Sequence, residues 1–229
     1  MTEFIFHAPD TYRENAWISN MDEYQAMYKE SIEDPEGFWS KIADNFYWEK
    51  KWDTVRAFNY AISKGPVQIE WFRNAKTNIT YNCLDRHLAD RADQTALIWE
   101  GNSVGEDLEI TYRQLYQKVC QFANALKTKG VKKGDRVAIY MPMIPELAVT
   151  MLACARIGAI HSIVFGGFSS EALSDRILDS HCKVVVTADG VMRGAKAVPL
   201  KSNADVAMNL CQEQGHTVET CFVVKRTGA

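Results

Sequence analysis

The chain has 229 residues, of which 47% are hydrophobic and 24% are charged, and its formal net charge is −3. This composition is typical of a globular protein with a substantial core. A chain with this small negative net charge is not expected to bind DNA or RNA electrostatically.

Residues 1–75 are acidic and rich in aromatic side chains, which predicts a helical region packed onto a larger body rather than a disordered tail. Eleven of the first 50 residues are acidic and four are basic. No basic segment followed by an apolar run begins the chain, so no secretory signal is predicted. Asn20, with Glu23 at the capping-box position, predicts one helix, and Asp34–Pro35 predicts the start of another.

Residues 76–229 are predicted to form a second domain. Asn82 is expected to cap a helix from Cys83 to about Ala92. On such a helix Asp85 and His87 point apart, so ion pairing and capping explain these side chains better than a catalytic pair. A β-hairpin is expected from the apolar runs at 96–99 and 108–110.

A capping box of Thr111 and Gln114 then begins the clearest amphipathic helix of the chain, which ends near Gly130.

Three β-branched runs at 137–140, 160–165 and 184–186 alternate with segments of helical length. This alternation predicts an α/β fold, namely the first half of a doubly wound, mainly parallel sheet. A further helix at 199–211 and a strand at 220–224 continue the pattern. The apolar stretch 139–165 is interrupted by prolines and charges, so a buried core is predicted there and no membrane span.

Gly166 and Gly167 follow one of these strands and precede a helix that Ser169 or Ser170 can cap. A glycine turn at a helix N-terminus suits an anion, although an ordinary tight βα turn has the same sequence. Arg193 and Lys196 follow the next strand. Because ligands bind at the carboxyl ends of parallel strands, these cations fit a phosphorylated ligand, and two solvated surface charges fit equally well.

The six cysteines are scattered and form no C-x-x-C pair. This pattern predicts reduced thiols in a cytoplasmic protein, with neither a disulfide framework nor a metal site.

Three segments together carry a family resemblance: YNCLDRH (81–87), the run DRVAIYMPMIPELAVTMLACARIGAIHSIVFGGFSSEALSDRI (135–177) and TADGVMRGAKAVPLK (187–201). The chain resembles the AMP-forming acetyl-CoA synthetases of the adenylate-forming superfamily along essentially its whole length. The resemblance implies a helical N-terminal region at 1–75 and the first, incomplete part of an AMP-binding domain at 76–229.

It also implies an acetate:CoA ligase reaction in which acetate and ATP, with Mg²⁺, give acetyl-AMP, and CoA then gives acetyl-CoA and AMP. In this family the CoA nucleotide lies against a Phe-Gly-Gly loop and a short Arg-Gly-Gly-Arg segment. The matching residues here are Phe165, Gly166, Gly167, Arg193, Gly194, Ala195 and Lys196. Ala195 replaces a glycine and Lys196 an arginine, so one bidentate phosphate contact would become a point-charge contact.

No TSGSTG-like phosphate loop occurs in the chain, and the family's catalytic lysine lies beyond residue 229 in the family pattern. No catalytic residue is therefore assigned, and the chain alone is predicted to be an inactive N-terminal portion. An incomplete sheet would leave apolar surface uncovered, which predicts self-association. Three alternatives stay open. They are a sister propionate or acetoacetate ligase, a short nucleotide-binding or interaction module, and a hydride-transferring enzyme. The last is the least favoured, because the chain lacks the G-x-G-x-x-G motif of such enzymes.

Overall fold

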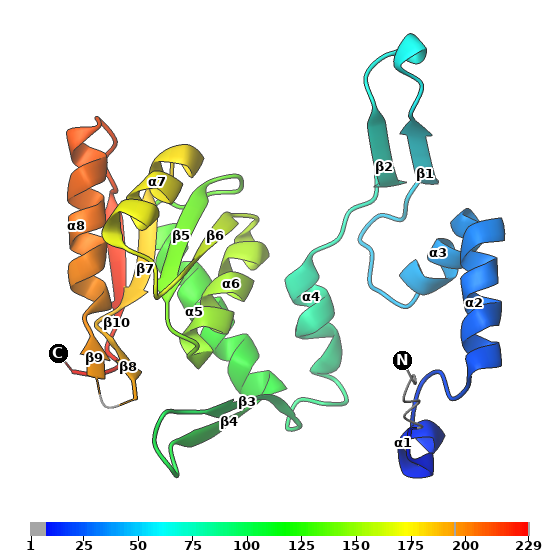
Figure 1. Ribbon diagram of the computed structural model, residues 1–229, viewed down its shortest axis with the longest axis horizontal. Coiled ribbons are helices and arrows are strands. Elements are labelled where there is room, and N and C mark those ends of the chain that lie inside the picture. The colour runs from blue at the N-terminus through cyan, green and yellow to red at the C-terminus, as the bar shows by residue number, and fades with distance from the viewer. Residues whose placement is uncertain (1–7, 195, 229) are drawn as a thin grey trace, which may run out of the picture. The chain divides into compact units, whose positions relative to one another are not determined.

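Two units of different construction make up the chain, Met1–Thr77 and Asn78–Ala229. The computed structural model describes residues 8–194 and 196–228. The first unit contains short helices and a two-stranded sheet, and the second contains a parallel sheet covered by helices (Figure 1). Within these described ranges, no helix combines the length and the apolar character that crossing a bilayer requires.

Side-chain caps begin the two longer helices of the first unit, as predicted. The Asn20 side chain accepts the backbone N–H of Glu23 at 2.9 Å, and the Asp34 carboxylate accepts that of Gly37 at 3.0 Å. The Glu23 carboxylate turns back to the N–H of Ser19, one residue before the predicted position. The helices of this unit are α1 (Asp10–Glu14), α2 (Met21–Glu33) and α3 (Pro35–Ala43).

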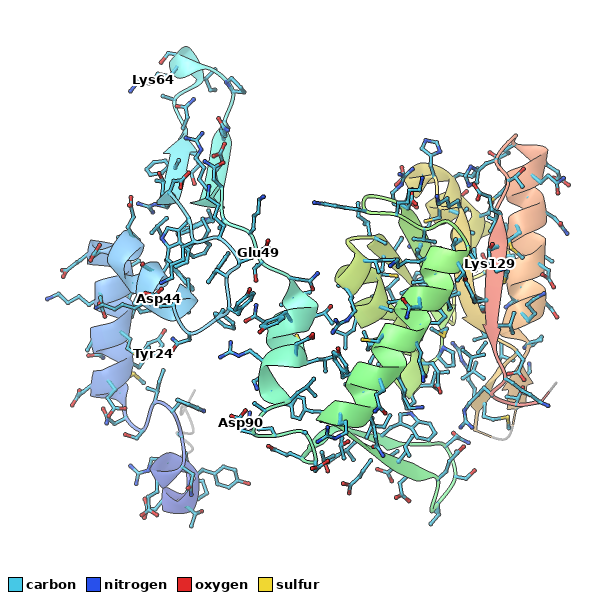
Figure 2. The ribbon with its side chains drawn as sticks, turned by 180° about the vertical axis from the view of Figure 1, so that it is seen from behind. Tyr24, Asp44, Glu49, Lys64, Asp90 and Lys129 are labelled. Carbon is cyan, nitrogen blue, oxygen red and sulfur yellow. The ribbon has the colours of Figure 1, made fainter. Side chains whose placement is uncertain are left out.

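A β-hairpin that the sequence analysis did not predict completes the first unit. Strand β1 (Thr54–Asn59) pairs antiparallel with β2 (Gln68–Arg73), and the 3₁₀ turn η1 (Ile62–Lys64) forms the tip that Figure 2 labels at Lys64. The rings of Trp48, Trp52 and Phe72 contact one another with centroids 5.0 to 5.4 Å apart. Part of the aromatic excess of this region thus forms one ring cluster.

The second unit is organised around a four-stranded sheet in the order β10-β7-β5-β6, and all its strands run parallel. The two inner strands are nearly inaccessible to solvent, which explains why they read as continuous apolar runs. This arrangement confirms the predicted α/β class. The strands are β5 (Arg136–Met141), β6 (Ile160–Phe165), β7 (Val184–Ala188) and β10 (Thr220–Val224).

Helices cover both faces of this sheet. Helices α5 and α6 pack together on one face, and α7 and α8 pack together on the other (Figure 1). Gly158 ends α6 in the left-handed conformation, with φ of 74°, where glycine is favoured. The helices are α5 (Tyr112–Thr128), α6 (Pro145–Ile157), α7 (Ser170–Ser180) and α8 (Leu200–Glu213).

The predicted hairpin and capping box before α5 are both confirmed. Strand β3 (Thr95–Glu100) pairs antiparallel with β4 (Asp107–Thr111). The Thr111 side chain accepts the N–H of Gln114, and the Gln114 side chain accepts the N–H of Thr111. Leu115, Val119 and Leu126 then bury the apolar stripe of α5, which ends beside Lys129 (Figure 2).

The predicted helix from Cys83 to Ala92, capped by Asn82, is wrong. The helix of this region is α4 (Ile79–Cys83), and Asn78 caps it by accepting the N–H of Thr80 at 2.9 Å. The Asn78 amide also donates to the carbonyl of Ala155 at 3.0 Å, near the end of α6. This tertiary bond selects Asn78 as the cap, and local sequence gives no sign of it.

After α4 the chain tightens into the 3₁₀ turn η2 (Asp85–His87). Asp85 forms a half-buried ion pair with Arg156, and the His87 ring lies against the Tyr112 ring with centroids 5.2 Å apart. Asp85 and His87 therefore make separate contacts, and Asp85 forms an ion pair as expected, although the helix on which that expectation rested is absent here.

Candidate functional site

The candidate site lies at the carboxyl ends of the parallel strands. The chain leaves β5 for a neighbour on one side, β6, and later returns to β7 on the other side. Such a reversal of strand order leaves a crevice at the carboxyl edge, where open α/β sheets bind ligands. The segments after β5, β6 and β7 all reach this crevice.

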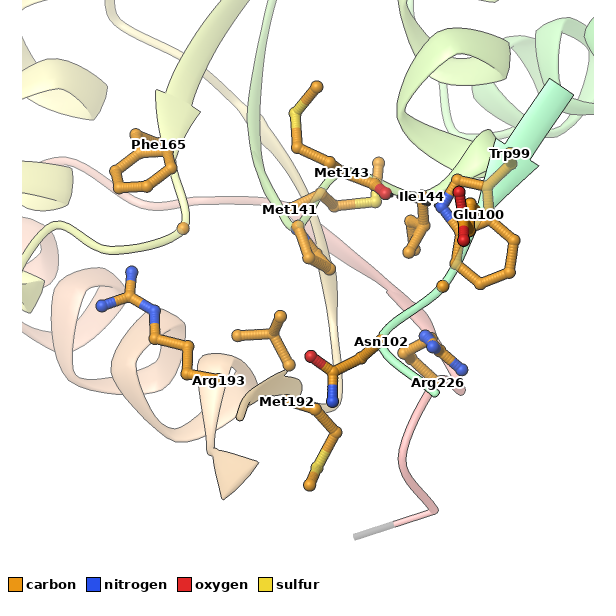
Figure 3. Close-up of a pocket in the computed structure, with 14 residues that line it drawn as sticks. Trp99, Glu100, Asn102, Met141, Met143, Ile144, Phe165, Met192, Arg193 and Arg226 are labelled. Atoms are coloured by element: carbon orange, nitrogen blue, oxygen red, sulfur yellow. Dashed lines mark hydrogen bonds between the residues drawn. The ribbon is translucent and has the colours of Figure 1, made fainter. Parts of the chain in front are cut away.

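A pocket of about 280 Å³ occupies this position (Figure 3). Its wall is mainly apolar, with two arginines and a glutamate among the lining residues. These residues come from five places: the end of β3 and the turn after it, the end of β5 and the segment after it, the end of β6, the hairpin after β7 and the segment after β10. They are Trp99, Glu100, Gly101, Asn102, Met141, Pro142, Met143, Ile144, Phe165, Gly166, Val191, Met192, Arg193 and Arg226.

The two glycines after β6 make room for close neighbours. A Cβ on Gly167 would stand 2.2 Å from a guanidinium nitrogen of Arg193, and one on Gly166 would stand 3.2 Å from the Met141 carbonyl. The buried Tyr140 hydroxyl donates to the Phe168 carbonyl at 2.8 Å and fixes the turn from below. The guanidinium group of Arg193 therefore occupies the space that a side chain at position 167 would fill.

Arg193 reaches this turn from the hairpin of β8 (Val191–Arg193) and β9 (Lys196–Val198), which the sequence analysis did not predict. Its guanidinium carbon lies 5.7 Å from the centre of the Phe165 ring, within cation–π range. Figure 3 shows Arg193 and Phe165 side by side at one wall of the pocket. The Phe165 side of this pair faces solvent, since 60% of the residue is exposed.

A second arginine, Arg226, stands at the opposite wall over the ring of Trp99, at 5.2 Å. Unlike Arg193, it forms an ion pair with Glu106, and its hydrogen bond is the main reason that the pKa of Glu106 lies below its ordinary value. No carboxylate of the described part of the chain pairs with Arg193. Both guanidinium groups are charged, but only the charge of Arg226 is balanced by a neighbouring carboxylate, so Arg193 is the better candidate to bind an anionic ligand.

The structure brings together only part of the predicted residue set. Phe165, Gly166 and Arg193 line the pocket, and Gly167 contacts Arg193 directly. Lys196 is exposed on the neighbouring strand of the hairpin and does not line the pocket, and Gly194 forms the turn with φ of 58°. Ala195 lies outside the described residues.

Sequence reasoning missed Trp99, Asn102 and Arg226. A signal existed for Arg226, because it follows strand β10 and so stands at the same carboxyl edge as Arg193. No such signal exists for Asn102 or Trp99, which belong to a separate hairpin that the tertiary fold brings to the pocket.

Asp189 fixes the chain beside the pocket. Its carboxylate, which is 9% exposed, accepts backbone N–H groups from Gly190, Arg226, Thr227 and Gly228 at 2.7 to 3.2 Å. Burial alone would raise the pKa of Asp189, but these donors outweigh it and hold the pKa at about 2. The segment after β10 is thereby tied to the end of β7.

Among residues 8–194 and 196–228, no group of three or more histidine, cysteine or acidic side chains is placed to hold a metal ion.

Two family models match the chain. The model described as "AMP-binding enzyme" matches residues 84–229, and the model described as "Acetyl-coenzyme A synthetase N-terminus" matches residues 24–83. The first match covers more than half of the chain and includes the whole pocket.

Curated relatives carry the same family name. The acetyl-coenzyme A synthetase of Desulfatibacillum aliphaticivorans is 52% identical over 229 residues, which are 100% of this chain and 34% of the relative. That of Magnetococcus marinus is 56% identical over 214 residues, which cover 93% of this chain and 32% of the relative. The chain thus spans about a third of the length of the curated relatives it matches.

Among solved structures, the acetoacetyl-CoA synthetase from Streptomyces lividans matches with a TM-score of 0.75 at 23% identity. The match covers 90% of this chain and 30% of that chain, and at this identity it supports the fold alone. The family matches, the close relatives and the parallel α/β fold agree. This chain belongs to the AMP-binding enzyme family, and residues 24–83 match the acetyl-coenzyme A synthetase N-terminus.

Proposed function

We propose that the chain forms the N-terminal part of an acetate:CoA ligase that makes acetyl-CoA from acetate, ATP and CoA through acetyl-AMP. The support is the 52 to 56% identity to acetyl-coenzyme A synthetases together with the two family matches. Within this proposal, residues 1–75 are the helical N-terminal region and 76–229 are the first part of the AMP-binding domain. In this proposed reaction Mg²⁺ belongs to the ATP-dependent step.

We further propose that the pocket wall holds part of the CoA nucleotide. The single observation that carries this assignment is the meeting of Arg193 with Phe165 and Gly167 at the carboxyl edge of the sheet. An exposed ring face suits an adenine, and a guanidinium without a carboxylate partner suits a phosphate. Gly166 and Gly194 provide backbone close to the ligand, and the exposed Lys196 adds a second cation. Ala195 stays in the proposed set by its place in the sequence between Gly194 and Lys196.

The assignment is tested by isothermal titration of the chain with CoA and with adenosine 3′,5′-bisphosphate, which is the nucleotide portion of CoA. Replacing Arg193 by Ala removes a charged hydrogen-bond donor, so about a tenfold loss of affinity is expected. Arg176 is a matched control, because it also stacks on a phenylalanine, Phe168, at 4.7 Å but does not line the pocket. An equal loss in Arg176→Ala, or no binding by the unaltered chain, would contradict the assignment.

Acetate-dependent exchange between ATP and pyrophosphate tests whether the chain carries the first chemical step by itself. We expect no exchange, because the proposed nucleotide site uses binding groups only and no catalytic residue is assigned. Robust exchange would show that the chain contains an acid-activating site of its own. Replacing acetate by propionate or acetoacetate in the same assay, with the whole ligase, distinguishes the acid substrate.

We propose a cytoplasmic location and self-association through the sheet edges. All six cysteines are free, which supports a reducing compartment. Edge strand β6 exposes Ile160, Ile163 and Phe165, and edge strands with apolar side chains favour pairing between chains. Cell fractionation tests the location. Light scattering after size-exclusion chromatography tests the association, and a monomer at every concentration would exclude it.

A further inference from the structure

The turn between β3 and β4 is organised by one carboxylate. One oxygen of Glu106, Oε2, accepts the backbone N–H of Asn102 at 3.0 Å and that of Ser103 at 3.3 Å. The other oxygen, Oε1, pairs with the guanidinium of Arg226. A single side chain therefore holds both the shape of the turn and its attachment to the end of β10.

The same turn reaches the hairpin that carries Arg193. The Asn102 side-chain amide donates to the carbonyl of Gly194 at 3.1 Å. Figure 3 shows Asn102 at the pocket wall, on the side where Met192 and Arg226 are drawn. The hairpin has strands of only three residues each, and a hairpin of that size is marginal without outside contacts.

Together with Asp189, these contacts form a closed ring that joins the β8–β9 hairpin, the β3–β4 turn and the ends of β10 and β7. The backbone N–H of Arg226 donates to Asp189 at 2.8 Å, and Asp189 stands at the end of β7, directly before the hairpin. From the hairpin, the contacts run through Asn102 to Glu106, then to Arg226 and back through Asp189. The pocket is bordered by this ring of polar contacts as well as by its apolar wall.

We propose that Asn102 and Glu106 are positioning residues for Arg193, and this inference rests on the proposed nucleotide site. Arg193 has no ion pair of its own within the described ranges, so the hairpin and the Phe165 ring determine where its guanidinium stands. The brace from Asn102 to Gly194 keeps the hairpin in one place before ligand arrives. A prearranged cation binds a phosphate more tightly than a mobile one, because less ordering accompanies binding.

The test compares Asn102→Ala with Val104→Ala, a substitution at a fully exposed position of the same turn. Hydrogen exchange of the 191–198 segment is the ligand-independent measurement. Losing one hydrogen bond is expected to speed exchange there about fivefold in Asn102→Ala, and Val104→Ala is expected to leave it unchanged. Glu106→Gln should speed exchange in the same segment, because it weakens the turn and the Arg226 pair together.

Affinity for adenosine 3′,5′-bisphosphate is the functional measurement, with adenosine as the comparison ligand. We expect Asn102→Ala to weaken the bisphosphate about fivefold and adenosine much less, since the brace acts through a phosphate-binding cation. In an Arg193→Ala background the effect of Asn102→Ala should disappear, because a residue that acts through Arg193 has nothing left to position.

The possible outcomes distinguish failure of the positioning role from failure of the nucleotide site. Unchanged exchange at 191–198, or an undiminished effect of Asn102→Ala when Arg193 is absent, would overturn the positioning role. Affinity that falls in Arg193→Ala and persists in Asn102→Ala would overturn the positioning role and leave the nucleotide site intact. A chain that binds no bisphosphate in any form would overturn both.

Discussion

The two units of the chain are stabilised by different means. In Asn78–Ala229 the inner strands β5 and β7 are shielded on both faces, and Val137 to Tyr140 have no accessible surface. In Met1–Thr77, α2 buries none of its side chains, and the contacts of this unit include edge-to-face rings and exposed ion pairs. Exposed ion pairs contribute little to stability, whereas buried apolar area contributes much. The candidate site therefore belongs to the unit that contains the buried parallel sheet.

The largest contrast is expected from the same substitution made once in each unit. Ile139, at the centre of β5, is 0% exposed, and Ile62, at the tip of the first unit's hairpin, is 84% exposed. Ile139→Ala should lower the free energy of unfolding by about 3 kcal/mol through lost burial and a cavity. Ile62→Ala should change it by less than about 0.5 kcal/mol. Urea titration followed by circular dichroism measures both, and similar losses would invalidate the comparison.

A smaller, pH-dependent contrast is expected at Asp189. Because its pKa falls from the usual 3.8 to about 2 in the fold, its charged form stabilises the protein above pH 4, and that contribution disappears as the pH falls toward 2. Asp189→Asn places an amide donor among backbone donors, so a loss of about 2 kcal/mol is expected at pH 7.

The measurement for Asp189 is the difference in urea midpoint between the unaltered chain and Asp189→Asn from pH 7 to pH 2.5. The gap should be constant above pH 5 and shrink below pH 4. Asp107→Asn, at an exposed position of β4, is the matched control and should cost less than about 0.5 kcal/mol. A gap that stays constant to pH 2.5 would show that the carboxylate charge does not stabilise this edge of the sheet.

The scaffold of the second unit was predictable because local signals agreed with the tertiary fold. The β-branched runs of β5, β6 and β7 and the Thr111–Gln114 box each specify one structure by themselves. The cap of α4 was not predictable, since Asn78 and Asn82 are equivalent candidates until the Ala155 carbonyl selects one. The two strands of the first unit's hairpin are partly exposed, and buried and exposed residues do not alternate strictly along them. The sequence therefore shows no clear two-residue hydrophobic period there.

The residues of the candidate site also divide into those that the sequence could predict and those that it could not. Phe165, Gly166 and Arg193 could be predicted to meet because parallel strands bring their carboxyl ends to one edge. Trp99 and Asn102 could not, because their hairpin lies outside the parallel sheet and its position depends on contacts such as the bond from the Trp99 indole to the Met143 carbonyl at 2.8 Å. Sequence periodicity specifies the elements, and the bonds between their loops complete the pocket.

The smallest expected effect comes from removing one helix cap in each unit. Thr111→Ala and Asn20→Ala each remove a side-chain acceptor worth about 1 kcal/mol. Since α5 packs against the sheet through buried residues, Thr111→Ala should lower the hydrogen-exchange protection of β5 about fivefold. Since α2 buries no side chain, Asn20→Ala should increase exchange in α2 alone and leave β5 unchanged. If both variants lower the protection of β5 equally, the two units unfold as one cooperative body and the contrast between them disappears.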